Sequence, residues 1–203
     1  MRNNHYANVT IVALCLIISG WALAKSNVLG FLQTPERVIL QARPDKKDPL
    51  EITEIKVKEK MIKFAETFVE DGEWLKETTF KIRNKYSKPI TYVHIDIDFP
   101  ETVATGIMMQ RQLFLGQHPA PKRPSPRPPL RILPGESLEV SLASEFDGIK
   151  RMIELRNPSI NNISQILIRL NEVAFEDGTL YSGGNIYRLN PDPNGPKWLK
   201  VIE

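Results

Sequence analysis

Cysteine is nearly absent from this chain. Its 203 residues include one cysteine, Cys15, which lies in an N-terminal apolar run. The residues after it can form no disulfide with one another and offer no thiol nucleophile or thiolate metal ligand. Packing alone is therefore expected to stabilise the fold, and cysteine-based catalysis is excluded.

Histidine, net charge and phosphate-binding motifs are also scarce. After residue 24 the histidines are His94 and His118, too few for a histidine-rich zinc site. The formal net charge is +3, far from the balance of a nucleic-acid-binding protein. The sequence has no G-x-S-x-G elbow and no glycine-rich loop followed by Lys-Ser/Thr. We predict no catalytic, cofactor-binding or metal-binding residue and no nucleic-acid partner.

The one long hydrophobic run is at the N-terminus. Arg2 precedes the apolar stretch Ile11–Ile18, and Ala22–Ala24 supplies an A-x-A cleavage site. This order is typical of a signal peptide, with cleavage near Ala24/Lys25 and export to the periplasm or outside the cell. An uncleaved anchor is the alternative, although the apolar stretch is shorter than the ~20 residues that span a bilayer. The scarcity of cysteine favours a bacterial periplasm.

Alternation with period two dominates the rest of the chain. Val93, Ile95 and Ile97 are apolar between polar neighbours, the pattern of a strand with one buried side. In residues 163–175 the alternation changes phase, which predicts a bulge near Asn171. Asp177-Gly178 lies between two such runs and predicts a hairpin.

A single segment has helical spacing. Phe146, Ile149 and Ile153 repeat as on one helix face, with Ser144 as the expected N-cap and Asn157-Pro158 as the stop. Eight or nine strands and one short helix predict an all-β fold, a single antiparallel immunoglobulin-like β-sandwich, with a β-barrel as the alternative. The expected segments are a signal peptide (1–24), a tether (25–36), the sandwich domain (37–189) and a C-terminal tail (190–203).

Several short segments resemble a group of uncharacterised exported bacterial β-sandwich proteins. The resemblance covers about residues 60–190, and Tyr181 stands where that group has a tryptophan. It implies a fold and a compartment but no activity. The segments are Glu73–Lys76 (EWLK), Thr79–Lys81 (TFK), Asn84, Ser87–Ile90 (SKPI), Asp98–Glu101 (DFPE), Leu133–Glu136 (LPGE) and Phe175–Thr179 (FEDGT).

The strongest acidic cluster is His94, Asp96 and Asp98 on one side of a predicted strand. Side chains two residues apart on a strand are about 6 to 7 Å apart. Two carboxylates and an imidazole at this spacing are able to hold a metal or act as acid and base in a small hydrolase. The favoured interpretation is a solvated strand face.

Two further patterns suggest ligands. Asn190–Gly195 fits the first half of a calcium loop, but Val201 stands where a bidentate Glu is required, so a plain turn is preferred. Trp74, Tyr92 and Tyr181 are candidates for the aromatic platform of a carbohydrate-binding module. Burial of these rings in the core or at a sheet edge is the alternative.

The segment His118–Gly135 is rich in proline and has no acidic residue. It lies between two predicted strands, so it is a loop within the domain. We expect it to shield strand edges, because proline cannot donate to a ladder. Alternatively, its cations contact an anionic envelope polymer, lipid headgroups or an acidic envelope protein. Those cations are Lys122, Arg123, Arg127 and Arg131.

These observations favour an exported, non-enzymatic domain with a binding or structural role in the cell envelope. A carbohydrate-binding module and a small hydrolase using Asp96 and Asp98 are the alternatives. The β-sandwich expectation does not choose among them, because such folds carry many unrelated functions.

Overall fold

A computed structural model describes residues 35–42, 46–120, 127–155, 159–192 and 194–201. The chain divides into two compact units, residues 1–35 and Glu36–Glu203, and the fold below is that of the second. The predicted signal peptide and nearly all of the predicted tether lie outside the described residues. Among the described residues, no helix is long and apolar enough to cross a membrane.

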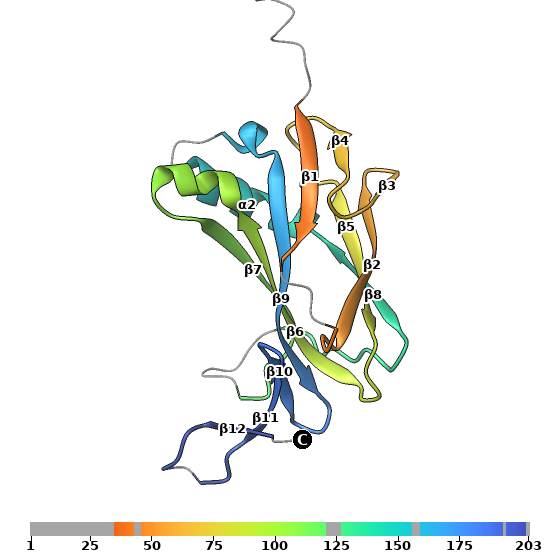
Figure 1. Cartoon of the computed structure of the whole chain (residues 1–203), viewed down its shortest axis with the longest axis vertical. Coiled ribbons are helices and arrows are strands. Elements are labelled where there is room, and N and C mark those ends of the chain that lie inside the picture. Colours follow the sequence, from red (N-terminus) through yellow and green to blue (C-terminus); the bar gives the residue numbers. More distant parts are fainter. Residues whose placement is uncertain (1–34, 43–45, 121–126, 156–158, 193, 202–203) are drawn as a thin grey trace, which may run out of the picture. The chain divides into compact units, whose positions relative to one another are not determined.

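The unit from Glu36 onward is built from two open β-sheets (Figure 1). The larger sheet contains β1 (Glu36–Gln41), β4 (Thr67–Val69), β6 (Ile90–Phe99), β7 (Met109–Gly116), β9 (Gln165–Phe175), β10 (Leu180–Ser182), β11 (Asn185–Leu189) and β12 (Trp198–Lys200). The smaller sheet contains β2 (Leu50–Val57), β3 (Lys60–Ile62), β5 (Thr78–Asn84) and β8 (Ser137–Ser141), in the order β3-β2-β5-β8. The open sheets fit a β-sandwich and not the barrel. The described strands outnumber the predicted eight or nine because four have three residues, too short for an alternation to show.

The core lies between the two sheets. Ile95 and Ile97 of β6 belong to the same buried cluster as Phe80 and Ile82 of β5. The buried Trp74 lies between β4 and β5 in the sequence and packs edge-on against Phe68 of β4. Both sheets therefore contribute one apolar face each, as the alternation of their strands requires.

Strand β9 organises the larger sheet. It pairs with β6 on one side and with both β1 and β10 on the other. His94 pairs with Glu172 and Ile95 with Leu170, so Asn171 is the extra residue of a bulge. The predicted bulge is confirmed, and it lets Ile166 and Val173, which have opposite parity, both reach the core.

One pair of strands contradicts the predicted antiparallel arrangement. β1 runs parallel to β9, with Val38 opposite Gln165 and Gln41 opposite Ile168. The preceding residue, Arg37, is buried, and its guanidinium donates to the carbonyl oxygens of Ile163 and Asn161. These bonds join β1 to the segment that leads into β9. Sequence alternation identifies strands but does not give their direction, which explains the error.

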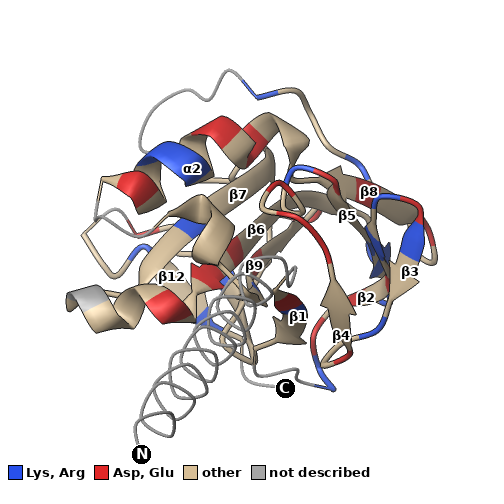
Figure 2. Ribbon diagram, turned by 90° about the horizontal axis from the view of Figure 1, so that it is seen from above, with Lys and Arg blue, Asp and Glu red and all other residues tan. Residues whose placement is uncertain are grey.

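The predicted helix is present as α2 (Phe146–Glu154), with Phe146, Ile149 and Ile153 buried. Its charged residues lie at positions that alternate with this apolar face, and Figure 2 shows acidic and basic segments along it. The Ser144 side chain does not cap α2, because this residue belongs to the 3-10 turn η2 (Ala143–Glu145) that precedes the helix. The other 3-10 turns are η1 (Pro100–Thr105) and η3 (Ile160–Asn162).

The C-terminal part of the chain adds strands to the larger sheet. The predicted hairpin at Asp177-Gly178 is confirmed, since it joins the antiparallel strands β9 and β10 and Gly178 has a φ of 80°. The predicted tail contains β12, which pairs with β11. Leu189 lies opposite Trp198, and Tyr187 lies opposite Lys200. A three-residue strand leaves no recognisable period, so the sequence alone gave no indication of it. Strands β10, β11 and β12 lie at the end opposite α2 (Figure 1).

Candidate functional site

The polar side of β6 is buried, not solvated. Asp96 is 1% exposed, Asp98 is 3% exposed and His94 is 7% exposed. These side chains alternate with Ile95 and Ile97, which face the core between the sheets, so they lie on the outer side of the larger sheet. The favoured interpretation of this pattern as a solvated face is therefore wrong.

Two segments distant in sequence cover the Tyr92 end of this outer side. The His118 ring, at the start of the proline-rich loop, packs edge-on against Tyr92 at 4.9 Å and against Trp198 of β12 at 6.0 Å. The His94 ring lies 4.5 Å from that of Phe114 on β7. A second, small apolar cluster results, with Tyr92 at its centre and Trp198 packed against it. The cover over this end of β6 is thus a consequence of tertiary structure.

Arg169 of β9 pairs with both aspartates. Its Nη2 lies 3.0 Å from Oδ2 of Asp98 and 3.6 Å from Oδ2 of Asp96. The bulged Asn171 donates from Nδ2 to Oδ2 of Asp96 at 3.0 Å. Burial raises the pKa of Asp98, and the charge of Arg169 opposes this rise. The bulge and the ion pairs therefore compensate the buried carboxylates.

His94 and His118 lie next to these charged side chains. His94 Nε2 is 2.9 Å from Oδ1 of Asp96, and the two atoms are not aligned as a hydrogen bond. Oε2 of Glu172 lies 3.9 Å from Nδ1 of His94 and 3.9 Å from Nε2 of His118. Interaction with His94 lowers the pKa of Glu172, and burial lowers the pKa of His118.

The arrangement is closed to substrates. Asp96 and Asp98 are almost fully buried and ion-paired with Arg169, so neither carboxylate is accessible to a substrate. In the described part of the chain, no group of three or more His, Cys, Asp or Glu side chains is placed to hold a metal ion. We call the set His94, Asp96, Asp98, Arg169 and Glu172 the buried polar array.

The three aromatic candidates do not form an exposed platform. Trp74 and Tyr92 are buried in different clusters, and Tyr181 is buried as well. The indole Nε1 of Trp74 donates to the carbonyl oxygen of Ile163 at 3.1 Å, which fixes the ring within the core. The residues named for carbohydrate binding are therefore structural, except that Tyr181 also lines the pocket described below.

The segment Asn190–Gly195 uses its side-chain oxygens locally. Oδ1 of Asn190 accepts from the backbone N–H of Asp192 at 3.0 Å, and Oδ1 of Asp192 accepts from that of Asn194 at 2.9 Å. Such contacts are typical of Asx turns. Two of the oxygens considered as calcium ligands thus stabilise a turn; Pro193 lies outside the described residues.

The proline-rich loop is anchored at both ends. The carbonyl oxygen of Ala120 accepts from Nζ of Lys197 at 2.9 Å, and the Arg127 guanidinium lies 4.8 Å above the Phe114 ring. Arg131 pairs with Glu176, its Nε lying 2.9 Å from Oε1. Lys122 and Arg123 are among residues 121–126, outside the described part. Two of the four cations predicted for a contact site therefore interact within the domain.

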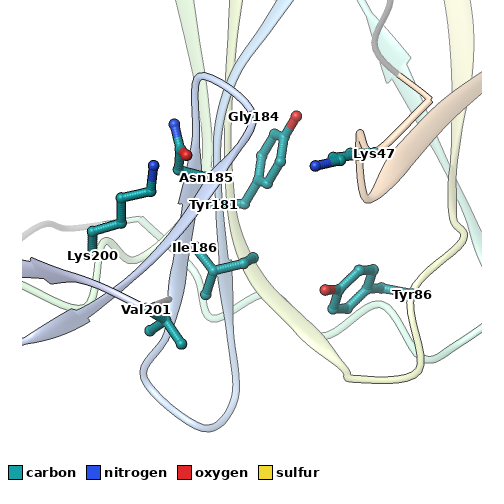
Figure 3. A pocket seen from close by; sticks show the side chains of 8 residues that line it. All are labelled: Lys47, Tyr86, Tyr181, Gly184, Asn185, Ile186, Lys200 and Val201. Carbon is teal, nitrogen blue, oxygen red and sulfur yellow. The ribbon is translucent and has the colours of Figure 1, made fainter. Parts of the chain in front are cut away.

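A pocket that no sequence pattern indicated lies at the β10–β11 end (Figure 3). Its volume is about 430 Å³. Lys47 precedes β2, Tyr86 lies in the turn between β5 and β6, and the remaining lining comes from β10 to β12 and the residue that follows β12. The lining side chains most relevant to binding are Lys47, Tyr86, Tyr181, Asn185, Ile186 and Lys200.

The two tyrosine rings of this pocket are held in place. Tyr86 stacks on Phe175 with the ring centroids 5.1 Å apart. The Tyr181 hydroxyl donates to Oδ1 of Asp48 at 2.6 Å. Figure 3 shows the ammonium of Lys47 directed toward Tyr181 and the hydroxyl of Tyr86 directed into the same space. A turn tyrosine next to a lysine-rich segment was the one available sequence signal, and it is too common to identify a pocket.

No known protein family, curated protein or solved structure matches this chain. The similarity to uncharacterised exported bacterial proteins stays a prediction.

Proposed function

We propose that this chain is an exported, non-enzymatic β-sandwich domain that binds a component of the cell envelope. One observation carries the proposal: Asp96 and Asp98, the best candidates for acid–base catalysis, are buried and ion-paired with Arg169. Catalytic carboxylates must reach the substrate's proton directly or through one water. The buried polar array serves the packing of the larger sheet. Binding is therefore expected at the exposed surface and in the pocket.

Export is part of the proposal. Its support is the order of Arg2, the apolar run Ile11–Ile18 and the A-x-A site at Ala22–Ala24, which predicts a periplasmic or secreted mature chain. We also propose that the sandwich is of the immunoglobulin-like type, because hairpins and two facing sheets build its core.

The proposed partner is an anionic envelope polymer or an envelope protein. The sequence predicted a contact site on the proline-rich loop, but Arg127 and Arg131 interact within the domain. The pocket at the β10–β11 end offers cationic and aromatic side chains in a concave surface instead. This pocket also keeps the carbohydrate-binding alternative open, with Tyr86 and Tyr181 in place of the predicted platform.

The experiment uses the full chain, expressed with its own export segment and purified after export. Co-sedimentation with insoluble cell-envelope polysaccharide is measured together with the release of reducing ends. We expect sedimentation with the polysaccharide, no release, and equal sedimentation of a folded Asp98→Asn variant. Release that disappears in Asp98→Asn would establish a hydrolase, and a chain that stays in the supernatant with every envelope fraction would remove the binding proposal.

A further inference from the structure

We infer that the pocket at the β10–β11 end binds an anionic sugar unit, one that carries a carboxylate or phosphate group. This inference rests on the proposed binding function and specifies its site and ligand class. The pocket volume of about 430 Å³ lies within the range of small-molecule sites, roughly 300–1,000 Å³. A single sugar unit with its acidic group fits such a volume.

The pocket carries positive charge. Lys47 and Lys200 both line the pocket, and both side chains are solvent-exposed. Figure 3 shows them on opposite sides of Tyr181. Among the described residues that line the pocket, none is acidic. Ammonium groups on a concave surface attract an anion most strongly at low ionic strength, because salt screens exposed charges over about 10 Å at 0.1 M.

The surface between the two lysines is aromatic and apolar. The Tyr86 and Tyr181 rings and the side chains of Ile186 and Val201 give the pocket apolar surface. A pyranose ring presents C–H groups on its faces and hydroxyl groups at its edge. Aromatic side chains match this amphipathic character, because their faces are apolar and a tyrosine hydroxyl is polar. A purely inorganic anion would leave this apolar surface unused.

The two tyrosine side chains of the pocket are preorganised. Phe175 holds the Tyr86 ring, and Asp48 holds the Tyr181 hydroxyl. Walls that are already ordered cost less conformational entropy on binding. The Asn185 side chain supplies both a donor and an acceptor for the hydroxyl groups of a sugar. The pocket thus has separate groups for the acidic part and for the hydroxyl groups of one ligand.

The test uses the full exported chain and titration calorimetry at low salt. Trigalacturonic acid and glucose 6-phosphate are the carboxylate and phosphate probes, and maltotriose and inorganic phosphate are the matched neutral and sugar-free probes. We expect at least one anionic sugar to bind, with maltotriose and inorganic phosphate at least about tenfold weaker. The stronger of the two anionic probes identifies the acidic group.

Substitutions locate the site. Lys47→Met combined with Lys200→Met should weaken binding of the anionic sugar by about tenfold or more. The control, Lys63→Met with Lys150→Met, makes the same charge change at two exposed positions elsewhere and should leave affinity unchanged. Tyr86→Phe, which keeps the ring on Phe175, should reduce affinity severalfold without loss of folding.

The outcomes separate this inference from the proposed function. Equal loss of affinity in the control pair, or no binding of either anionic sugar by a chain that still sediments with envelope polysaccharide, overturns the pocket assignment alone. Binding of inorganic phosphate as strongly as the sugars overturns the ligand class. A chain that binds neither the probes nor any envelope fraction overturns both.

Discussion

Replacing Arg169 with methionine tests whether the buried polar array is structural. The substitution keeps a long, flexible side chain on β9 but removes the positive charge that lies 3.0 Å from Asp98 and 3.6 Å from Asp96. Both carboxylates then remain buried without their cation. We expect the variant to fold with a lower free energy of unfolding at pH 7.

The magnitude follows from the exposure of the pair. Removing one partner of a fully buried ion pair costs about 3–5 kcal/mol, whereas exposed pairs contribute about 0–1 kcal/mol. The Asp98 side chain is 4% exposed, but 34% of the Arg169 side chain is exposed, so solvent screens the pair in part. We therefore expect a loss of about 2 kcal/mol.

The loss should shrink as the pH falls. Burial raises the pKa of Asp98, and Arg169 opposes this rise, so removing Arg169 raises the pKa further. A carboxyl whose pKa is higher in the folded than in the unfolded state binds more protons when folded, and its contribution to stability improves as the pH drops. Urea denaturation of wild type and Arg169→Met between pH 7 and about pH 4 measures this difference.

Arg83→Met is the matched control. Arg83 pairs with Glu51 at 2.7 Å, but both side chains are more than 40% exposed. Arg83→Met makes the same change from arginine to methionine in a strand, and it should lower the free energy of unfolding by less than about 1 kcal/mol. A loss for Arg169→Met no larger than that for Arg83→Met, or a loss independent of pH, would refute the burial of the two aspartates.

Three further predictions concern other parts of the fold. Trp74→Ala should cost about 3–5 kcal/mol in urea denaturation, because it leaves a cavity and removes the donor to Ile163; a cost below ~1 kcal/mol would contradict the core position. Arg131→Ala should lower stability by less than about 1 kcal/mol, since its pair with Glu176 is exposed, and a larger loss would contradict the exposed position of this pair. Burial lowers the pKa of His118, so wild type should lose stability relative to His118→Gln as the pH falls below the ordinary value of 6.5, and an unchanged difference between pH 7 and about pH 5 would refute it.

Local features of this fold were predictable from the sequence. The bulge at Asn171, the hairpin at Asp177-Gly178 and the helix α2 each depend on residues close together in the chain. Periodicity and turn chemistry are short-range properties, and they also favoured a β-sandwich class. The cap expected from Ser144 did not form, because a 3-10 turn occupies that position.

Long-range features were decided by the tertiary structure. Alternation placed Asp96 and Asp98 on the side of β6 that faces away from the core, but their burial and their contacts with Arg169 and Asn171 of β9 arise between distant segments. The same limit applies to the parallel pairing of β1 with β9, because alternation carries no direction.

The pocket at the β10–β11 end is the clearest case of this difference. It combines Lys47, Tyr86 and Lys200, which lie far apart in the chain and share no pattern. By itself the sequence determined which segments are strands and where they turn, since these depend on neighbouring residues. Which polar residues are enclosed and which line an open pocket depends on contacts between distant segments, and only the folded chain brings those segments together.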